Sequence, residues 1–109
     1  MPTTYKVLGQ TAPASATLAT LYTVPSSTQA CVSTVSVCNT AATATSYRLA
    51  VRPQGTTAAT QHYIVYDASI PGNDTTVLTI GISLGASDVV SCYATTNTLS
   101  FSAFGAEIT

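Results

Sequence analysis

The side chains that could take part in acid–base, nucleophilic or metal chemistry are few and dispersed in this chain. The 109 residues include one histidine, three cysteines and four acidic residues. They are His62, Cys31, Cys38, Cys92, Asp67, Asp74, Asp88 and Glu107. A hydrolytic triad needs a nucleophile, a base and an orienting acid, but no GxSxG-type motif surrounds any serine. We therefore predict that the chain is not an enzyme and that His62 is a hydrogen-bonded residue on a sheet face.

The spacing of the acidic residues predicts neither a glycosidase nor a metal site. A glycosidase needs two carboxylates only a few ångströms apart. Asp74 and Asp88 lie in turn-like segments, where aspartate bonds to nearby backbone groups. Calcium at Asn73 and Asp74 would find few oxygen ligands. The sequon that begins at Asn73 is better explained by turn chemistry, since we expect no signal peptide in the opening residues MPTTYKVLGQ.

The three cysteines predict neither a disulfide framework nor a zinc site. An odd number leaves one thiol over, and no CxxC pair is present. Cys31 and Cys38 are seven residues apart on one expected strand, which places them on opposite faces, whereas Cys92 could meet either of them. We predict small buried apolar side chains in a reducing compartment, with no metal and no cofactor.

The charge content excludes several classes of partner. Only 6% of the residues are charged, the net charge is −1, and the cations are Lys6, Arg48 and Arg52. Phosphate backbones and anionic membranes need clustered basic residues, so we predict no nucleic acid and no membrane partner. We expect Arg48 and Arg52 on a solvated strand face, or bonded to a carboxylate of a neighbouring subunit. Such a neutral surface favours burial against other protein.

The elements that would position these residues are strands. Between residues 74 and 104, aliphatic and hydroxyl-bearing residues alternate with a period of two, which is typical of β-strands with one buried face. We predict strands at residues 3–8, 17–24, 30–39, 46–52, 60–68, 75–84, 89–94 and 99–104. Residues 1–109 then form one all-β domain, a single antiparallel β-sandwich of about eight short strands. A jelly-roll and an immunoglobulin-like order both fit.

Three local expectations follow from the same pattern. Residues 9–15 are expected to be a connector and residues 105–109 a tail. Phe104 is out of phase with Leu99 and Phe101, and a bulge near Ala103 would turn it inward. The six tyrosines are scattered over several strands, so we expect sheet packing, with a sugar-stacking platform as the alternative.

Several segments carry a family resemblance that spans nearly the whole chain. They are YKVLGQ (5–10), LYTVP (21–25), VCN (37–39), QHYIVYD (61–67) and LSFSAFGAEI (99–108). These segments resemble a family of small virion structural proteins of tailed bacteriophages. The resemblance implies a β-sandwich protein present in many copies per particle, without catalytic residues. It implies no role for Cys31, Cys38 or Cys92, because the family is often less cysteine-rich.

The combined expectation is a non-enzymatic virion structural protein. We predict a capsid decoration (cement) protein, made in the host cytoplasm and bound to the outside of the shell, where it cross-links subunits of the major capsid protein or another virion protein. We predict a homo-oligomer, a homotrimer. The alternatives are a tail, neck or baseplate component, or a module that binds a host-surface glycan.

Overall fold

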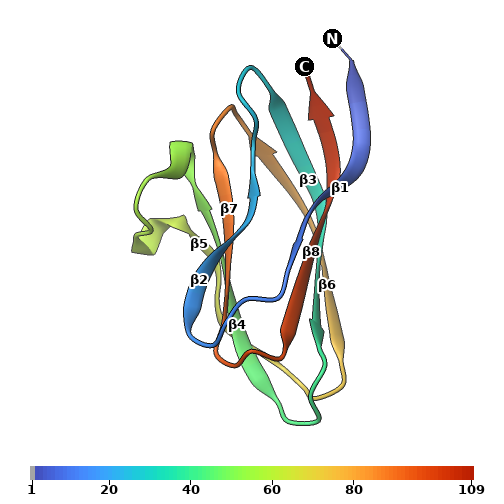
Figure 1. Ribbon diagram of the computed structural model, residues 1–109, viewed down its shortest axis with the longest axis vertical. Coiled ribbons are helices and arrows are strands. Elements are labelled where there is room, and N and C mark those ends of the chain that lie inside the picture. The colour runs from blue at the N-terminus through green and yellow to red at the C-terminus, as the bar shows by residue number, and fades with distance from the viewer. Residues whose placement is uncertain (1) are drawn as a thin grey trace.

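Two four-stranded antiparallel sheets pack face to face in the computed structural model, which describes residues 2–109 (Figure 1). The strands are β1 (Thr3–Thr11), β2 (Thr17–Thr23), β3 (Gln29–Asn39), β4 (Thr45–Arg52), β5 (Tyr63–Ile70), β6 (Thr75–Leu84), β7 (Val89–Ala94) and β8 (Leu99–Ile108). Sheet A has the order β1-β8-β3-β6 and sheet B the order β2-β7-β4-β5. The predicted all-β sandwich is confirmed. The strand order is that of a jelly roll, because successive strands mostly alternate between the sheets.

Pairing between distant strands makes β1 and β8 longer than predicted. They pair antiparallel from Thr3 opposite Ile108 to Thr11 opposite Phe101. The expected connector at residues 9–15 and tail at residues 105–109 are therefore partly strand, because each strand supplies the hydrogen-bonding partner that the other needs. The start of β1 and the end of β8 lie side by side at one end of the sandwich (Figure 1), where the Thr109 N–H donates to the Pro2 carbonyl (3.1 Å).

The predicted fifth strand begins three residues later than expected. Residues 60–62 form a 3-10 turn, η2 (Thr60–His62), which follows a similar turn, η1 (Pro53–Gly55). The His62 N–H donates to the Ala59 carbonyl (3.0 Å), and the Ala59 N–H donates to His62 Nδ1 (3.0 Å). These local bonds occupy backbone groups that a sheet ladder would otherwise use.

The core lies between the sheets and is built from the aliphatic half of each alternating pattern. Its fully buried side chains include Val32, Val35, Val37, Leu49, Ile70, Val90, Leu99 and Phe101. Tyr47 packs edge-to-face on Phe101, with ring centroids 6.2 Å apart. This arrangement places one residue from β4 against one from β8 and so joins the two sheets.

A bulge in β3 reverses the expected placement of two cysteines. Val32 pairs with Gly105 and Thr34 with Phe104, so Ser33 is an extra residue relative to β8. The bulge shifts the phase by one residue. Cys31 and Cys38 therefore both lie on the outer face of sheet A, and the prediction that they occupy opposite faces is wrong. They remain about 20 Å apart along the strand, and all three cysteines are free.

The predicted inward turn of Phe104 is also wrong. Phe104 lies opposite Val7 of β1, and the extra residues at this level are Leu8 in β1 and Ser33 in β3. Because β8 itself keeps its alternation, Phe104 points outward and is 36% exposed. The predicted bulge near Ala103 is absent, and the extra residues at this level lie in the two neighbouring strands.

A close approach between β1 and β2 joins the sheets at one edge. A Cβ at Gly9 would overlap the carbonyl oxygen of Leu21. Leu21 is itself the extra residue in β2, since Thr20 pairs with Ser91 and Tyr22 with Val90. Only glycine allows the two backbones to come this close.

Candidate functional site

His62 lies in the 3-10 turn η2, where its ring and its backbone N–H both bond to Ala59. Its Nδ1 atom accepts the Ala59 N–H, so the predicted hydrogen-bonded histidine is confirmed. The predicted place on a sheet face is wrong, because His62 lies in the 3-10 turn before β5. No group of three or more His, Cys, Asp or Glu side chains within residues 2–109 could hold a metal ion. Among the described residues, the His, Cys, Asp and Glu side chains thus form no metal-binding cluster.

Two of the acids serve local backbone groups, as predicted. Asp74 accepts the N–H of Thr75 (2.9 Å). Asp88 accepts the N–H groups of Gly85 (2.8 Å) and Gln54 (2.9 Å), which ties the β6–β7 turn to η1. These carboxylates stabilise turns.

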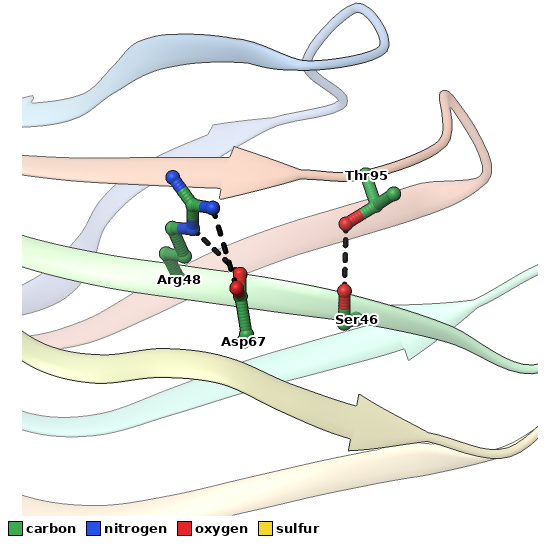
Figure 2. A network of polar contacts seen from close by, with 4 residues as sticks. All are labelled: Ser46, Arg48, Asp67 and Thr95. Atoms are coloured by element: carbon green, nitrogen blue, oxygen red, sulfur yellow. Dashed lines mark hydrogen bonds and ion pairs between the residues drawn. The ribbon is translucent and has the colours of Figure 1, made fainter.

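Asp67 has a different environment, because it meets Arg48 on the outer face of sheet B. The Arg48 Nε donates to Asp67 Oδ1 (2.6 Å) and Nη2 to Oδ2 (3.3 Å). Figure 2 shows the two side chains pointing toward each other on the side of β4 where Ser46 meets Thr95. The bonds to Asp67 raise the pKa of Arg48. The carboxylate that this arginine binds therefore belongs to its own chain.

Arg48 is also sandwiched between two tyrosine rings. Its guanidinium carbon lies 4.1 Å from the ring centre of Tyr66 and 4.3 Å from that of Tyr93. Tyr93 lies directly opposite Arg48 in the β4–β7 pair. Tyr66 reaches the same side because β5 has an extra residue between Val65 and Ala68, where Asp67 adopts a positive φ of 52°.

The tyrosines on sheet B are less scattered than the sequence indicates. Tyr63 packs edge-to-face on Tyr66, with centroids 5.1 Å apart, and the two line an open hollow of about 320 Å³ together with Thr60. We call Tyr63, Tyr66, Tyr93 and Arg48 the aromatic cluster. Strand alternation alone does not reveal it, because the β5 bulges bring its members together.

Arg52 braces the loop beside the aromatic cluster. Its Nε donates to the hydroxyl of the buried Ser91 (3.0 Å), and Nη1 donates to the Thr56 carbonyl (3.1 Å). The guanidinium is thus engaged inside its own chain. Both arginines lie on the outer face of sheet B as predicted, and they are half-buried and bonded within their own chain.

Lys6 and Glu107 form a polar link between the two sheets. The Lys6 Nζ lies 2.9 Å from one Glu107 oxygen, and the buried Tyr22 donates its hydroxyl to the other (2.6 Å). These hydrogen bonds lower the pKa of Glu107. Burial and the same carboxylate raise the pKa of Tyr22. Lys6 and Glu107 are the only charged residues in the four strands of sheet A.

The outer face of sheet A consequently has no charged side chain and several apolar ones. Tyr5 is 83% exposed, Val77 59%, and Val7 lies opposite Phe104. We call this the neutral face, represented by Tyr5, Val7, Cys31, Ser33, Val77, Thr79 and Phe104. A hollow of about 400 Å³ lies on it, floored by Gly105 and Ala106 and flanked by Tyr5 and Cys31.

The three cysteines have three different environments. Cys92 is fully buried in the core, and burial raises the pKa of its thiol to about 12. Cys31 is exposed and Cys38 is half-buried. The predicted buried apolar role therefore holds for Cys92 and is wrong for Cys31.

Comparison with protein-family models, with curated proteins and with solved structures finds no match for this chain. Within the described residues, the structure contains no helix of the length and apolarity needed to cross a membrane.

Proposed function

We propose that the protein is a non-enzymatic structural component of a tailed-bacteriophage particle. In this role it decorates the outside of the capsid and cross-links subunits of the major capsid protein. The observation that carries the proposal is the neutral face, a four-stranded surface of apolar and hydroxyl-bearing side chains without charge. Exposed apolar patches of this kind are typical of protein–protein contact.

The disposition of the cations supports an outward location rather than contact with packaged DNA. Lys6 pairs with Glu107, Arg48 with Asp67, and Arg52 with the Ser91 hydroxyl and a backbone carbonyl. Each of these three cationic side chains thus already has a partner within the chain. Nucleic-acid binding depends on basic groups that are free to neutralise phosphates.

Attachment through the neutral face would use apolar burial and hydrogen bonds. Tyr5 combines a large apolar ring with a hydroxyl, a pairing that is enriched at protein interfaces. Hydroxyl-bearing residues such as Ser33 on β3 and Thr79 on β6 lie on the same face of the sheet. A contact through these residues would place no charged side chain against the capsid shell.

The copy number of this chain in purified particles tests the location. Hundreds of copies per particle support a capsid protein, because a closed shell repeats its subunits far more often than an axial tail does. Tens of copies or fewer would instead place the chain in the tail, neck or baseplate. The homotrimer stays a prediction from the sequence.

Two matched tyrosine variants test which face attaches the protein. Tyr5 is 83% exposed on the neutral face and Tyr66 is 60% exposed in the aromatic cluster, so neither truncation opens the core. We expect Tyr5→Ala to reduce incorporation into particles and Tyr66→Ala to leave it unchanged. The reverse pattern would contradict attachment through the neutral face.

A second candidate function is binding of a host-surface glycan, which the aromatic cluster favours. Tyr63, Tyr66 and the adjoining hollow offer an exposed aromatic wall beside the Asp67 carboxylate and Arg48. Binding of the purified protein to a glycan panel tests it. Glycan binding that is lost in Tyr66→Ala and kept in Tyr5→Ala would establish this function, whereas no binding by the unsubstituted protein would remove it.

A further inference from the structure

Three of the four edge strands of the sandwich are protected against pairing with another strand. β1 carries Lys6 and a bulge at Leu8, and it lies against β2 where Gly9 meets Leu21. β2 has its own bulge at Leu21. Bulges, charges and coverage are the devices by which natural sheets prevent association through their edges.

The edge strand β5 is protected in the same way. Its register with β4 shifts twice, once between Tyr47 and Leu49 and once between Leu49 and Ala50. Asp67 adds a charge and a positive φ in the middle of the strand. A straight partner strand could not follow this backbone.

β6 has neither the charges of β1 and β5 nor the close contact that joins β1 and β2. Its ten residues, TTVLTIGISL, contain no charged residue and no proline. Exposed and half-buried side chains alternate without interruption from Thr75 to Ser83. β6 also has one extra residue relative to β3, because Ile80 and Gly81 lie opposite Ser33, but this irregularity does not disturb the alternation. One edge of β6 pairs with β3, and among the described residues no strand pairs with the other.

The core is also incompletely closed along β6. Leu78, Ile80 and Ile82 face inward but remain half-buried, whereas Val32 and Val35 on the adjacent β3 are fully buried. A further strand beside β6 would remove the remaining aliphatic surface from water, and this burial is favourable.

We propose that β6 pairs antiparallel with β6 of a second copy of this chain about a two-fold axis at Thr79. Direct partners in an antiparallel pair share a face, so Leu78 lies opposite Ile80 of the second copy. Val77 lies opposite Gly81, where a Cβ would meet nothing within 4 Å. The exposed valine then covers the space beside the glycine.

Charge favours a second copy as the occupant of this edge. A two-fold axis brings the residues near it close to the same residues of the second copy. Pairing of β1 with β1 would therefore bring Lys6 near the second Lys6, and pairing of β5 with β5 would bring Asp67 near the second Asp67. β6 has no charge to repeat. Nine paired residues would add about nine backbone hydrogen bonds, close to the number in a typical protein interface.

Three variants of the whole chain test the pairing by sedimentation velocity. Thr79→Lys places two ammonium groups opposite each other at the axis, where like charges are destabilising. Thr79→Val keeps the β-branched shape without charge. Thr20→Lys makes the same charge change on the exposed surface of β2, at the far edge of sheet B.

The expected result is a mass of two chains at tens of micromolar for the unsubstituted protein, Thr79→Val and Thr20→Lys, in place of the homotrimer that the sequence predicts. Thr79→Lys should dissociate at a concentration at least about tenfold higher than the others. A monomer at millimolar concentration, a trimer, or equal weakening by Thr20→Lys would overturn the proposal.

Hydrogen exchange of the unsubstituted protein gives a second measurement that does not depend on the folding of a variant. The amides of β6 that face the free edge should become protected as concentration rises, and those of β1, β2 and β5 should not. Protection that rises in another edge strand would contradict the pairing. The two-fold pairing does not depend on the proposed capsid role, since the Tyr5 and Tyr66 variants test that role separately.

Discussion

A single buried amide organises three loops at one end of the molecule. Asn39 is 1% exposed, and its Nδ2 donates to the carbonyls of Thr43 (2.9 Å) and Pro71 (3.1 Å). Its Oδ1 accepts the Ala41 N–H and the Thr98 hydroxyl (both 3.1 Å). Both donors and both acceptor positions are thus used, which is what a buried polar side chain requires.

Asn39→Asp should destabilise the fold, although the two side chains have nearly the same shape. A carboxylate oxygen would replace the amide donor and face the carbonyls of Thr43 and Pro71. We expect the free energy of unfolding in urea to fall by about 3 kcal/mol or more. The exposed Asn97 provides the control, and Asn97→Asp should change it by less than about 0.5 kcal/mol. Equal losses in the two variants would contradict the assigned role of Asn39.

The cysteine environments lead to a labelling order. Cys31 is exposed, whereas Cys92 is fully buried with a raised thiol pKa of about 12. We expect a thiol reagent to label Cys31 in the folded protein and Cys92 only under unfolding conditions, because the thiolate is the reactive form. Peptide mapping by mass spectrometry measures both sites. Equal labelling rates in the native state would show that the core is not closed over Cys92.

At the scale of elements, bulges decide where side chains point. Ser33 in β3 moves Cys38 onto the same face as Cys31, and the β5 bulge brings Tyr66 and Asp67 together around Arg48. Each bulge shifts the inside–outside alternation by one residue. A prediction of which side chains face the core is therefore reliable only up to the next bulge in the strand.

The crossing of β1 and β2 predicts a large difference between two glycines. A Cβ at Gly9 would overlap the Leu21 carbonyl oxygen, which is backbone and cannot rotate away, whereas a Cβ at Gly81 meets nothing within 4 Å. We expect Gly9→Ala to lower the free energy of unfolding by at least about 1–3 kcal/mol. Gly81→Ala should change it by less than about 0.5 kcal/mol. Thermal or urea unfolding measures both, and a neutral Gly9→Ala would refute the close approach.

At the scale of the whole molecule, the small number of charges simplifies the dependence of stability on pH. The folded state lowers the pKa of Glu107, so its contribution is present above the unfolded pKa of about 4.3 and is lost as pH falls through the folded pKa. The folded state raises the pKa of Cys92 and Tyr22. Stability should therefore also fall as pH rises above about 8.5, where the unfolded chain begins to lose these protons.

Glu107→Gln should weaken the loss of stability at acidic pH. Urea unfolding between pH 2 and 5 would show a smaller slope of stability against pH than in the unsubstituted protein, because the variant has no carboxyl to protonate at this position. The loss of stability at alkaline pH should remain, because Cys92 and Tyr47 stay buried and burial raises the pKa of both side chains. An unchanged loss of stability at acidic pH would mean that the Lys6–Glu107–Tyr22 link does not contribute to it.

The neutral exterior also predicts how attachment to a particle responds to salt. Contacts made by the neutral face contain no ion pair to screen, so raising the ionic strength to about 1 M should release little protein. Quantifying the chain that remains with sedimented particles measures this. Release by moderate salt alone would contradict attachment through the neutral face.

The alternation of aliphatic and hydroxyl-bearing residues was enough to predict an all-β sandwich, most strand positions and the turn roles of Asp74 and Asp88. Such features depend on neighbours within a few residues, which sequence patterns report directly. The jelly-roll order, the lengthening of β1 and β8, the outward Phe104 and the aromatic cluster arise only in the folded chain. Strand order and bulges depend on which distant backbones pair, and the pairing energy of one ladder differs little from that of another until the whole core is packed.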